Sequence, residues 1–152
     1  METIKDHSYG VVPVIKRNGV WEVLLVHQIS YRGNNDRFWT FPKGHPEENE
    51  SVTDTAKREL LEETGISDVH IIADATFTIE YSFMFEGKKI EKTVAYFLGI
   101  CENKNTAISI PAEIAALEWC TFKEATAKLT HKNAQNVLLQ AGEYINKHTQ
   151  LV

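Results

Sequence analysis

The segment from Gly44 to Ile66, GHPEENESVTDTAKRELLEETGI, restricts the possible fold more than any other part of the chain. Ser51 is suited to cap the N-terminus of a helix, and Asp54 follows in the acidic position of a capping box. Gly65 is suited to the left-handed residue that ends a helix. The segment therefore predicts a helix over residues 51–64, preceded by an irregular loop that starts at Gly44.

The predicted helix gathers acidic side chains on one side. With about 3.6 residues per turn, Glu59 and Glu63 lie one turn apart, and Glu62 lies three residues from Glu59. The three carboxylates can therefore converge on one point. Arg58 lies one turn before Glu62 and can pair with it. The apolar residues form a neighbouring stripe that can face a core: Val52, Ala56 and Leu60.

Like charges gathered in this way destabilise a helix, and two interpretations of the cluster are open. The first is a solvated acidic face of the kind that Glu-rich helices commonly present. The second is a site for a hard cation, because Mg²⁺ takes oxygen ligands and is typically bound by a few carboxylates together with substrate phosphates.

Most of the remaining chain is typical of β-strands. Apolar and β-branched segments predict strands over residues 9–15, 21–27, 38–41, 69–73, 75–85, 93–100 and 114–119. Pro13 favours an edge or a bulge in the first strand, and Asn18-Gly19 predicts a tight turn after it. Residues 123–129 and 133–148 predict closing helices. Together these elements predict a mixed sheet with helices packed on both faces.

Size and charge limit the class of protein. The chain has 152 residues, which predicts one domain over residues 1–152. A net charge of −5 argues against a nucleic-acid binder, although a phosphorylated small molecule remains a suitable ligand. Cys101 and Cys120 lie in apolar contexts and predict buried thiols in a reducing compartment. Neither a signal peptide nor an apolar run of roughly 20 residues is present, so we expect a cytoplasmic protein with no membrane partner.

The spacing within the acidic segment resembles the Nudix box, the signature of the Nudix hydrolase family. The defined positions of that motif are all filled: Gly44, Glu50, Arg58-Glu59-Leu60, Glu62-Glu63 and Gly65-Ile66. The resemblance implies an α/β/α sandwich with a mixed β-sheet, in which residues 44–66 form a loop-helix-loop. It also implies hydrolysis of a nucleoside diphosphate linked to another moiety, with Mg²⁺ or Mn²⁺ as cofactor.

The resemblance further implies roles for individual residues of the motif. Glu59, Glu62 and Glu63 match the glutamates that bind metal, one of which often activates the attacking water. The backbone carbonyl at Lys43 matches the group that completes a metal shell. Three further matches brace or shape the motif: Arg58 and Glu50 hold the helix and loop, and Gly44 and Gly65 are structural.

Segments outside the box resemble the dinucleoside tetraphosphate hydrolases that cleave asymmetrically. The resembling stretches are FWTFPKGH, IEYSF, EKTVAYFLG and PAEIAALEWCTFKEATAKL. They imply that Lys92 and Lys43 contact distal phosphates, where solvated lysines are the alternative. Tyr81 and Tyr96 are candidates to stack on a base, with core packing as the alternative. Two weaker candidates follow: Glu113 as a further metal ligand or base, and His45 as a phosphate contact.

Four functions remain compatible with these patterns. The leading one is hydrolysis of diadenosine tetraphosphate to ATP and AMP, with a small nucleotide as the partner molecule. An RNA 5′ pyrophosphohydrolase would want an extended basic surface, which the acidic balance disfavours. A nucleoside triphosphate pyrophosphatase would need few contacts beyond the third phosphate. A nucleotide sensor without activity belongs to a different class and usually carries a degraded box, whereas this box is intact.

Overall fold

The computed structural model describes residues 2–30 and 36–148. The strands are β1 (Thr3–Arg17), β2 (Val20–Ile29), β3 (Arg37–Thr40), β4 (Lys43–Gly44), β5 (Val69–Phe85), β6 (Lys88–Cys101) and β7 (Ile114–Thr121). The helices are α1 (Val52–Thr64), α2 (Phe122–Lys128) and α3 (Lys132–Lys147). Strand order along the sheet is β3-β2-β1-β6-β5, while β4 pairs with β1 and β7 pairs with β2. The β1–β6 pair is parallel and the others are antiparallel, so the sheet is mixed as predicted.

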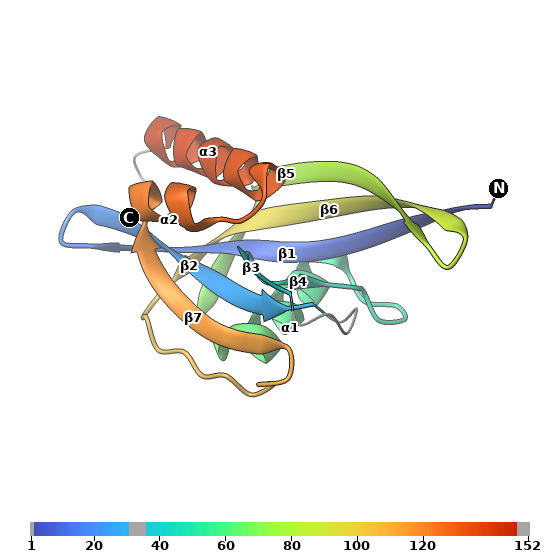
Figure 1. Ribbon diagram of the computed structural model, residues 1–152. Coiled ribbons are helices and arrows are strands. Elements are labelled where there is room, and N and C mark those ends of the chain that lie inside the picture. The colour runs from blue at the N-terminus through green and yellow to red at the C-terminus, as the bar shows by residue number, and fades with distance from the viewer. Residues whose placement is uncertain (1, 31–35, 149–152) are drawn as a thin grey trace.

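Helices cover both faces of the sheet. Figure 1 shows α3 and α2 above the sheet and α1 below it. Because successive residues of a strand face opposite sides, β1 supplies both cores. Val12 and Val14 pack into the core under α3, and Val11 packs into the core against α1 with Leu60. The arrangement confirms the predicted sandwich.

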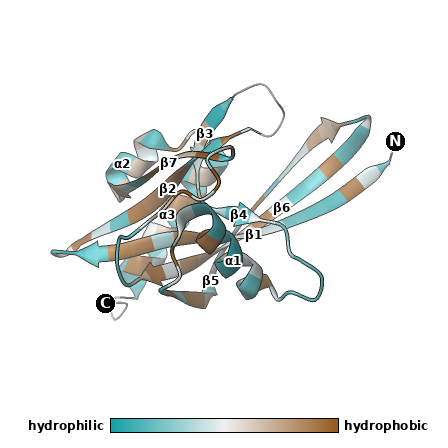
Figure 2. Ribbon diagram, turned by 90° about the horizontal axis from the view of Figure 1, so that it is seen from below, coloured by the Kyte–Doolittle hydropathy of each residue, from teal (hydrophilic) through white to brown (hydrophobic). Residues whose placement is uncertain are grey.

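A three-stranded ribbon projects from the body. It consists of the first half of β1 and the hairpin formed by β5 and β6, as Figure 2 shows from below. Within it, β1 runs parallel to β6 from the Thr3–Lys89 pair onward, and Tyr81 of β5 pairs with Lys92 of β6. The ribbon begins where β4 joins β1, through the Tyr9–Gly44 and Gly10–Lys43 pairs. The segment that contains the acidic helix therefore leaves the sheet at the root of the ribbon.

Three local expectations are wrong. Pro13 does not mark an edge strand, because β1 lies in the centre of the sheet. The pairing of β1 with β2 starts only at Val14, so Pro13, which has no backbone N–H, lies where β1 has no hydrogen-bonded partner on the β2 side. The segments 69–73 and 75–85 form one strand with an irregularity after Ile72. Val52 is exposed, because it lies in the first turn of α1, beyond the edge of the core.

The expected Asn-Gly turn and the expected burial of both cysteines are confirmed. Asn18 and Gly19 form a two-residue turn with positive φ values of 52° and 79°, as the Asn-Gly hairpin signal predicts. Cys101 and Cys120 are free and buried. In the described part of the chain, no helix has the length and apolarity needed to cross a lipid bilayer.

Two glycines allow a matched test of this packing. A Cβ on Gly10 would lie 2.2 Å from the carbonyl oxygen of Pro42, so Gly10→Ala forces two strands apart and should destabilise the protein by about 1–3 kcal/mol. Gly142 lies in α3 and has room for a Cβ, whose closest contact would be 3.6 Å away. Gly142→Ala should therefore stabilise by roughly 0.5–1 kcal/mol. Urea unfolding measures both changes, and a Gly10→Ala variant as stable as wild type would contradict the β1–β4 register.

Candidate active site

The local sequence sets both ends of α1. Ser51 accepts a hydrogen bond from the backbone N–H of Asp54 at 3.2 Å, which satisfies one of the open donors at the N-terminus. Gly65 adopts a left-handed conformation with φ of 79°, and its N–H donates to Leu61 at 2.9 Å. Ala56 and Leu60 are fully buried against the sheet. The acidic side of the helix consequently faces the loop that leads into it.

Arg58 is the centre of an ionic network on this side. Its guanidinium donates to Glu50 at 2.8 and 3.0 Å, to Glu59 at 2.9 Å and to Glu62 at 3.3 Å. It also donates to the backbone carbonyl of His45 at 2.8 Å. The planar guanidinium has five donors, which allows one side chain to join helix and loop in this way. The expected Arg58–Glu62 pair is thus present, and Glu47 lies 3.6 Å from the same guanidinium as a further ionic partner.

Glu50 is the loop residue of this network. It accepts from the hydroxyl of Thr55 at 2.7 Å and from the backbone N–H of Glu47 at 3.0 Å, in addition to Arg58. The hydrogen bonds from Arg58, then Glu47 and Thr55, lower the pKa of Glu50 to about 2. Glu50 is therefore ionised and fully bonded, which suits a bracing residue.

Gly44 leaves room for Glu59. A Cβ at Gly44 would lie 2.1–2.4 Å from the carboxylate atoms of Glu59. Gly44 has no positive φ; it belongs to the short strand β4, where an irregular loop was expected. The glycine is required here by the close approach of a carboxylate to the backbone.

Glu63 is a buried carboxyl with one oxygen that lacks a partner. Its side chain is only 6% exposed, and Oε1 has no hydrogen bond within the described structure. The carboxyl of Glu59 and the backbone of Lys43 lie beside Glu63 and influence its ionisation. Burial raises the pKa of Glu63 far above its usual value, and the neighbouring Glu59 carboxyl raises it further. A positive charge placed here would relieve both costs.

The donor set fits a hard cation, although it is not assembled around one. Among residues 2–30 and 36–148, no three His, Cys, Asp or Glu side chains are already grouped as metal ligands, because Arg58 engages Glu59 and Glu62. The unpaired oxygen of Glu63 and the Glu59 carboxylate against Gly44 nevertheless supply the oxygen donors that Mg²⁺ and Mn²⁺ prefer. The metal site of Glu59, Glu62 and Glu63 stays a prediction.

A second cluster lies beside the first, around Lys92. The Lys92 ammonium contacts Asp6 at 2.9 Å, Ser8 at 2.5 Å and Nε2 of His45 at 3.1 Å. Nε2 of His45 also lies 3.0 Å from Asp6. Partial burial raises the pKa of Asp6, but the hydrogen bonds from Lys92 and His45 outweigh it and bring that pKa below its usual value. Lys92 is buried, which excludes a simple solvated lysine.

Lys43 connects the two clusters. It is half-buried on β4, and burial lowers the pKa of its ammonium, while the nearby Glu63 and Glu59 carboxylates oppose the effect. The positive charges of Lys43 and Lys92 therefore lie next to the acidic site. This arrangement suits a ligand whose negative charges extend over more than one phosphate.

The aromatic candidates and Glu113 have different environments. Tyr81 is 40% exposed on the ribbon, with its ring stacked on Phe83 at a centroid distance of 6.1 Å. Tyr96 is only 1% exposed and packs edge-on against Phe41 in the core, which favours core packing, the alternative given for it, over a contact with a base. Glu113 is exposed, and its backbone carbonyl accepts from Ile29 at the start of β7. Within residues 2–30 and 36–148, no hydrogen bond or ion pair of its carboxylate supports or opposes a metal role.

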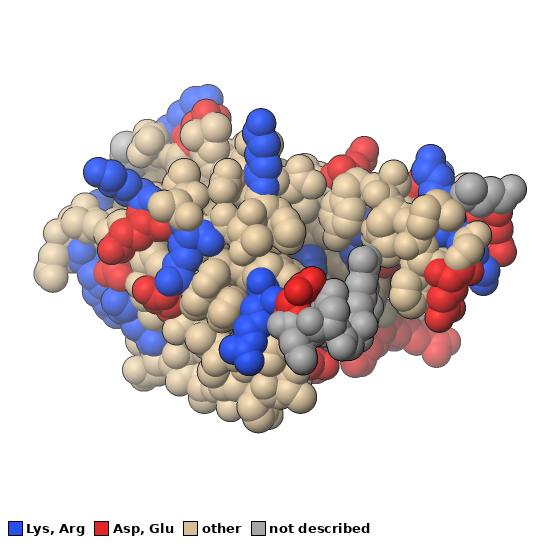
Figure 3. Space-filling model, in the orientation of Figure 1, with Lys and Arg blue, Asp and Glu red and all other residues tan. Residues whose placement is uncertain are grey.

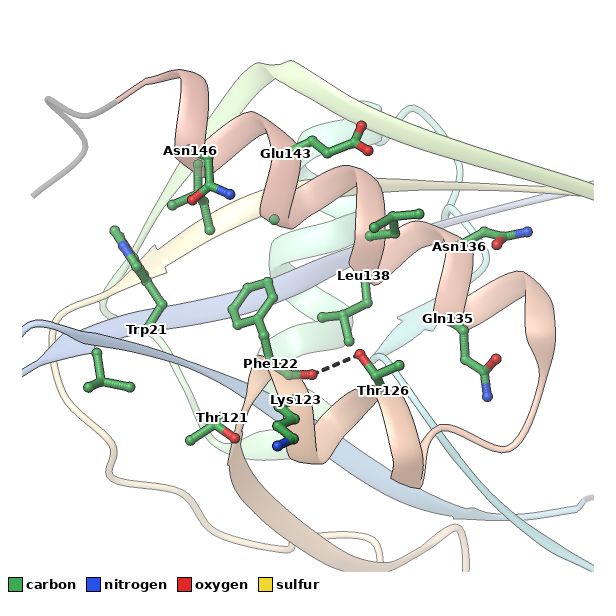
Figure 4. A pocket seen from close by; sticks show the side chains of 14 residues that line it. Trp21, Thr121, Phe122, Lys123, Thr126, Gln135, Asn136, Leu138, Glu143 and Asn146 are labelled. Carbon is green, nitrogen blue, oxygen red and sulfur yellow. Dashed lines mark hydrogen bonds between the residues drawn. The ribbon is translucent and has the colours of Figure 1, made fainter.

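A polar and an apolar pocket differ in their relation to this region. A pocket of about 480 Å³ lies on the ribbon, lined by charged and polar residues including Lys5, His7 and Lys92. An apolar pocket of about 680 Å³ lies between α2, α3 and the β1–β2 hairpin. Figure 4 shows Phe122 and Leu138 lining it from the two helices. Neither pocket is lined by a glutamate of α1, but the polar pocket shares Lys92 with the second cluster.

The buried carboxyl of Glu63 generates a stability prediction. A carboxyl whose pKa is raised on folding loses stability as pH rises from its unfolded pKa toward its folded pKa. Glu63→Gln keeps the shape and removes that loss. In chelator, the melting temperature of Glu63→Gln should exceed that of wild type by roughly 2–4 °C at neutral pH, and the gain should shrink toward pH 4. A clear drop in melting temperature at neutral pH would show that the ionised carboxylate has a structural partner.

Comparisons with known proteins agree with this geometry. The profile described as NUDIX domain matches residues 6–141. The Ap4A hydrolase of C. elegans, in the crystal structure of its binary complex, superposes with a TM-score of 0.78 at 28% identity, covering 93% of this chain and 98% of that chain. The asymmetrical bis(5′-nucleosyl)-tetraphosphatase of Rattus norvegicus is 34% identical over 104 residues, covering 68% of this chain and 69% of that protein.

Relatives with other names match equally well. The mRNA-decapping protein g5R of African swine fever virus (isolate Pig/Kenya/KEN-50/1950) is 30% identical over 140 residues, covering 91% of this chain. A Mycobacterium tuberculosis (strain CDC 1551 / Oshkosh) protein, whose name assigns it provisionally to the mutator proteins as MutT4, is 30% identical over 97% of this chain. The matches span 51% and 58% of those two proteins. The filled motif, the sandwich and the family match together show that this chain belongs to the Nudix hydrolase family.

Proposed function

We propose that this protein hydrolyses dinucleoside tetraphosphates, with diadenosine tetraphosphate as substrate and ATP and AMP as products. One observation carries the proposal: the buried Lys92 and the acidic motif meet at His45, whose ring contacts Lys92 while its carbonyl accepts from Arg58, and Lys43 feels the charges of Glu59, Glu63 and Lys92. A triphosphate has few phosphates to place beyond the cleaved bond. A tetraphosphate chain can place its cleaved anhydride at the glutamates and its further phosphates at both lysines.

Similar proteins support the proposal but do not single it out. Solved and curated relatives named as Ap4A hydrolases match over 93% and 68% of this chain. The viral decapping protein favours a second candidate, hydrolysis at the 5′ end of RNA. On the face shown in Figure 3, basic and acidic side chains are interspersed rather than gathered into one basic surface. That pattern, with a net charge of −5, favours a small substrate.

Different residues of this chain have different roles in the proposed reaction. Glu59, Glu62 and Glu63 would hold Mg²⁺ or Mn²⁺, which supplies charge neutralisation and a more acidic bound water. Arg58 and Glu50 fix the helix against the loop, so that the carboxylates keep their positions. Lys43 and Lys92 orient the phosphate chain, and Tyr81 is placed on the ribbon to stack on a base. Binding energy from the distal groups then helps to align the cleaved anhydride.

The first test concerns Glu63. Glu63→Gln keeps the side-chain volume and removes a charged ligand, so turnover at saturating Mg²⁺ should fall by at least about two orders of magnitude. Glu143→Gln in α3 is the matched control, since Glu143 is exposed and outside the motif, and it should keep wild-type turnover. Steady-state kinetics on diadenosine tetraphosphate measures both. Near-wild-type turnover in Glu63→Gln would overturn the assignment of the site.

The second test concerns the substrate. Diadenosine tetraphosphate should have a far higher kcat/KM than ATP, diadenosine triphosphate or triphosphorylated RNA, because only the tetraphosphate reaches both lysines. Chromatography should show ATP and AMP, and oxygen from labelled water should appear in AMP. A higher kcat/KM for triphosphorylated RNA would support the second candidate, while two molecules of ADP as products would rule out asymmetric cleavage.

A further inference from the structure

The ammonium of Lys92 is enclosed by three polar side chains. It carries three N–H groups, and three polar atoms lie within hydrogen-bond distance of it, from Asp6 at 2.9 Å, Ser8 at 2.5 Å and His45 at 3.1 Å. These partners come from β1 and from the loop after β4. Because the ammonium is buried among them, a phosphate oxygen can bond to Lys92 only if one of them moves away.

Asp6 is the partner whose place an anion can take. The side chains of Asp6 and His45 are 30% and 63% exposed, while that of Lys92 is 8% exposed. His45 can itself bond a phosphate, whereas the Asp6 carboxylate competes with a phosphate for the same donors. Ser8 is 2% exposed and fixed in β1. Asp6 also carries the same charge as a phosphate oxygen and bonds both Lys92 and His45, as a phosphate would.

We propose that Asp6 is a specificity-determining residue that occupies the phosphate position on Lys92 and His45 until an anionic group of the substrate replaces its carboxylate. The inference rests on the proposed function, because it assigns Lys92 to a distal phosphate. Asp6 neutralises the buried ammonium in the free protein, where an unpaired charge would be costly. It also sets a threshold, because a ligand must carry enough negative charge to displace a carboxylate.

If Asp6 competes with phosphate, removing its charge should affect stability and anion affinity in opposite directions, which removal of a purely structural residue would not do. Asp6→Asn keeps an amide oxygen for Lys92 but removes the competing charge. The free protein should become less stable, because Lys92 loses its ionic partner. Anions should nevertheless bind more tightly, because they no longer displace a carboxylate. A residue with only a structural role would lose both stability and affinity.

The experiment uses inorganic tripolyphosphate as the probe, in EDTA, with calorimetric titration of the full chain. Asp6→Asn should bind tripolyphosphate about five- to tenfold more tightly than wild type, although its melting temperature without ligand is lower. Glu91→Gln is the matched control: it removes one negative charge from the adjacent position of β6, on the opposite face, where Glu91 lies 3.9 Å from Lys89. It should leave the affinity unchanged within about twofold.

A third variant identifies the phosphate contact. Lys92→Met removes the ammonium. In the Lys92→Met background, Asp6→Asn should increase the affinity for tripolyphosphate by less than half as much as it does in the wild-type protein. Affinity in Asp6→Asn that equals or falls below wild type would overturn the proposal, as would an equal gain in Glu91→Gln. These titrations contain no metal and no cleavable nucleotide. If the protein fails to hydrolyse the tetraphosphate while Asp6→Asn still binds tripolyphosphate more tightly, the substrate assignment fails and the Asp6 exchange stands.

Discussion

The bonds of the Arg58 guanidinium are the interaction on which the site depends. Without a cation, Glu59, Glu62 and Glu63 would repel one another along one side of α1. Arg58 bonds two of these glutamates and also holds Glu50 and the carbonyl of His45. One side chain therefore stabilises the acidic helix and fixes the loop that leads into it.

The same loop joins the acidic site to the ribbon. The backbone carbonyl of His45 accepts a hydrogen bond from Arg58, and its ring nitrogen Nε2 contacts Lys92 and Asp6. The loop at His45 thus contacts both the carboxylate network of α1 and the ammonium of Lys92. A substrate bound on the ribbon would then lie close to the glutamates, which is the geometric basis of the proposed length preference.

The features that can be predicted correctly from the sequence are those that local chemistry decides. Ser51 and Gly65 bound the helix because caps act within a few residues, and Asn18-Gly19 forms its hairpin for the same reason. Features that depend on distant segments were missed. The central place of β1 depends on how strands associate, as does the choice between the two alternatives for Tyr96, which burial decides in favour of the core. The contact of Asp6 with Lys92 joins residues 86 positions apart, and no local pattern signals it.

An anomalous difference map from crystals grown with Mn²⁺ would show whether the glutamates of α1 hold a divalent cation. We expect a peak bounded by the carboxylates of Glu59 and Glu63, with Glu62 and the carbonyl of Lys43 in reach and with Glu59 released from Arg58. A fully bound cation elsewhere, with the bonds from Arg58 to Glu59 and Glu62 intact, would overturn the assignment of the metal site.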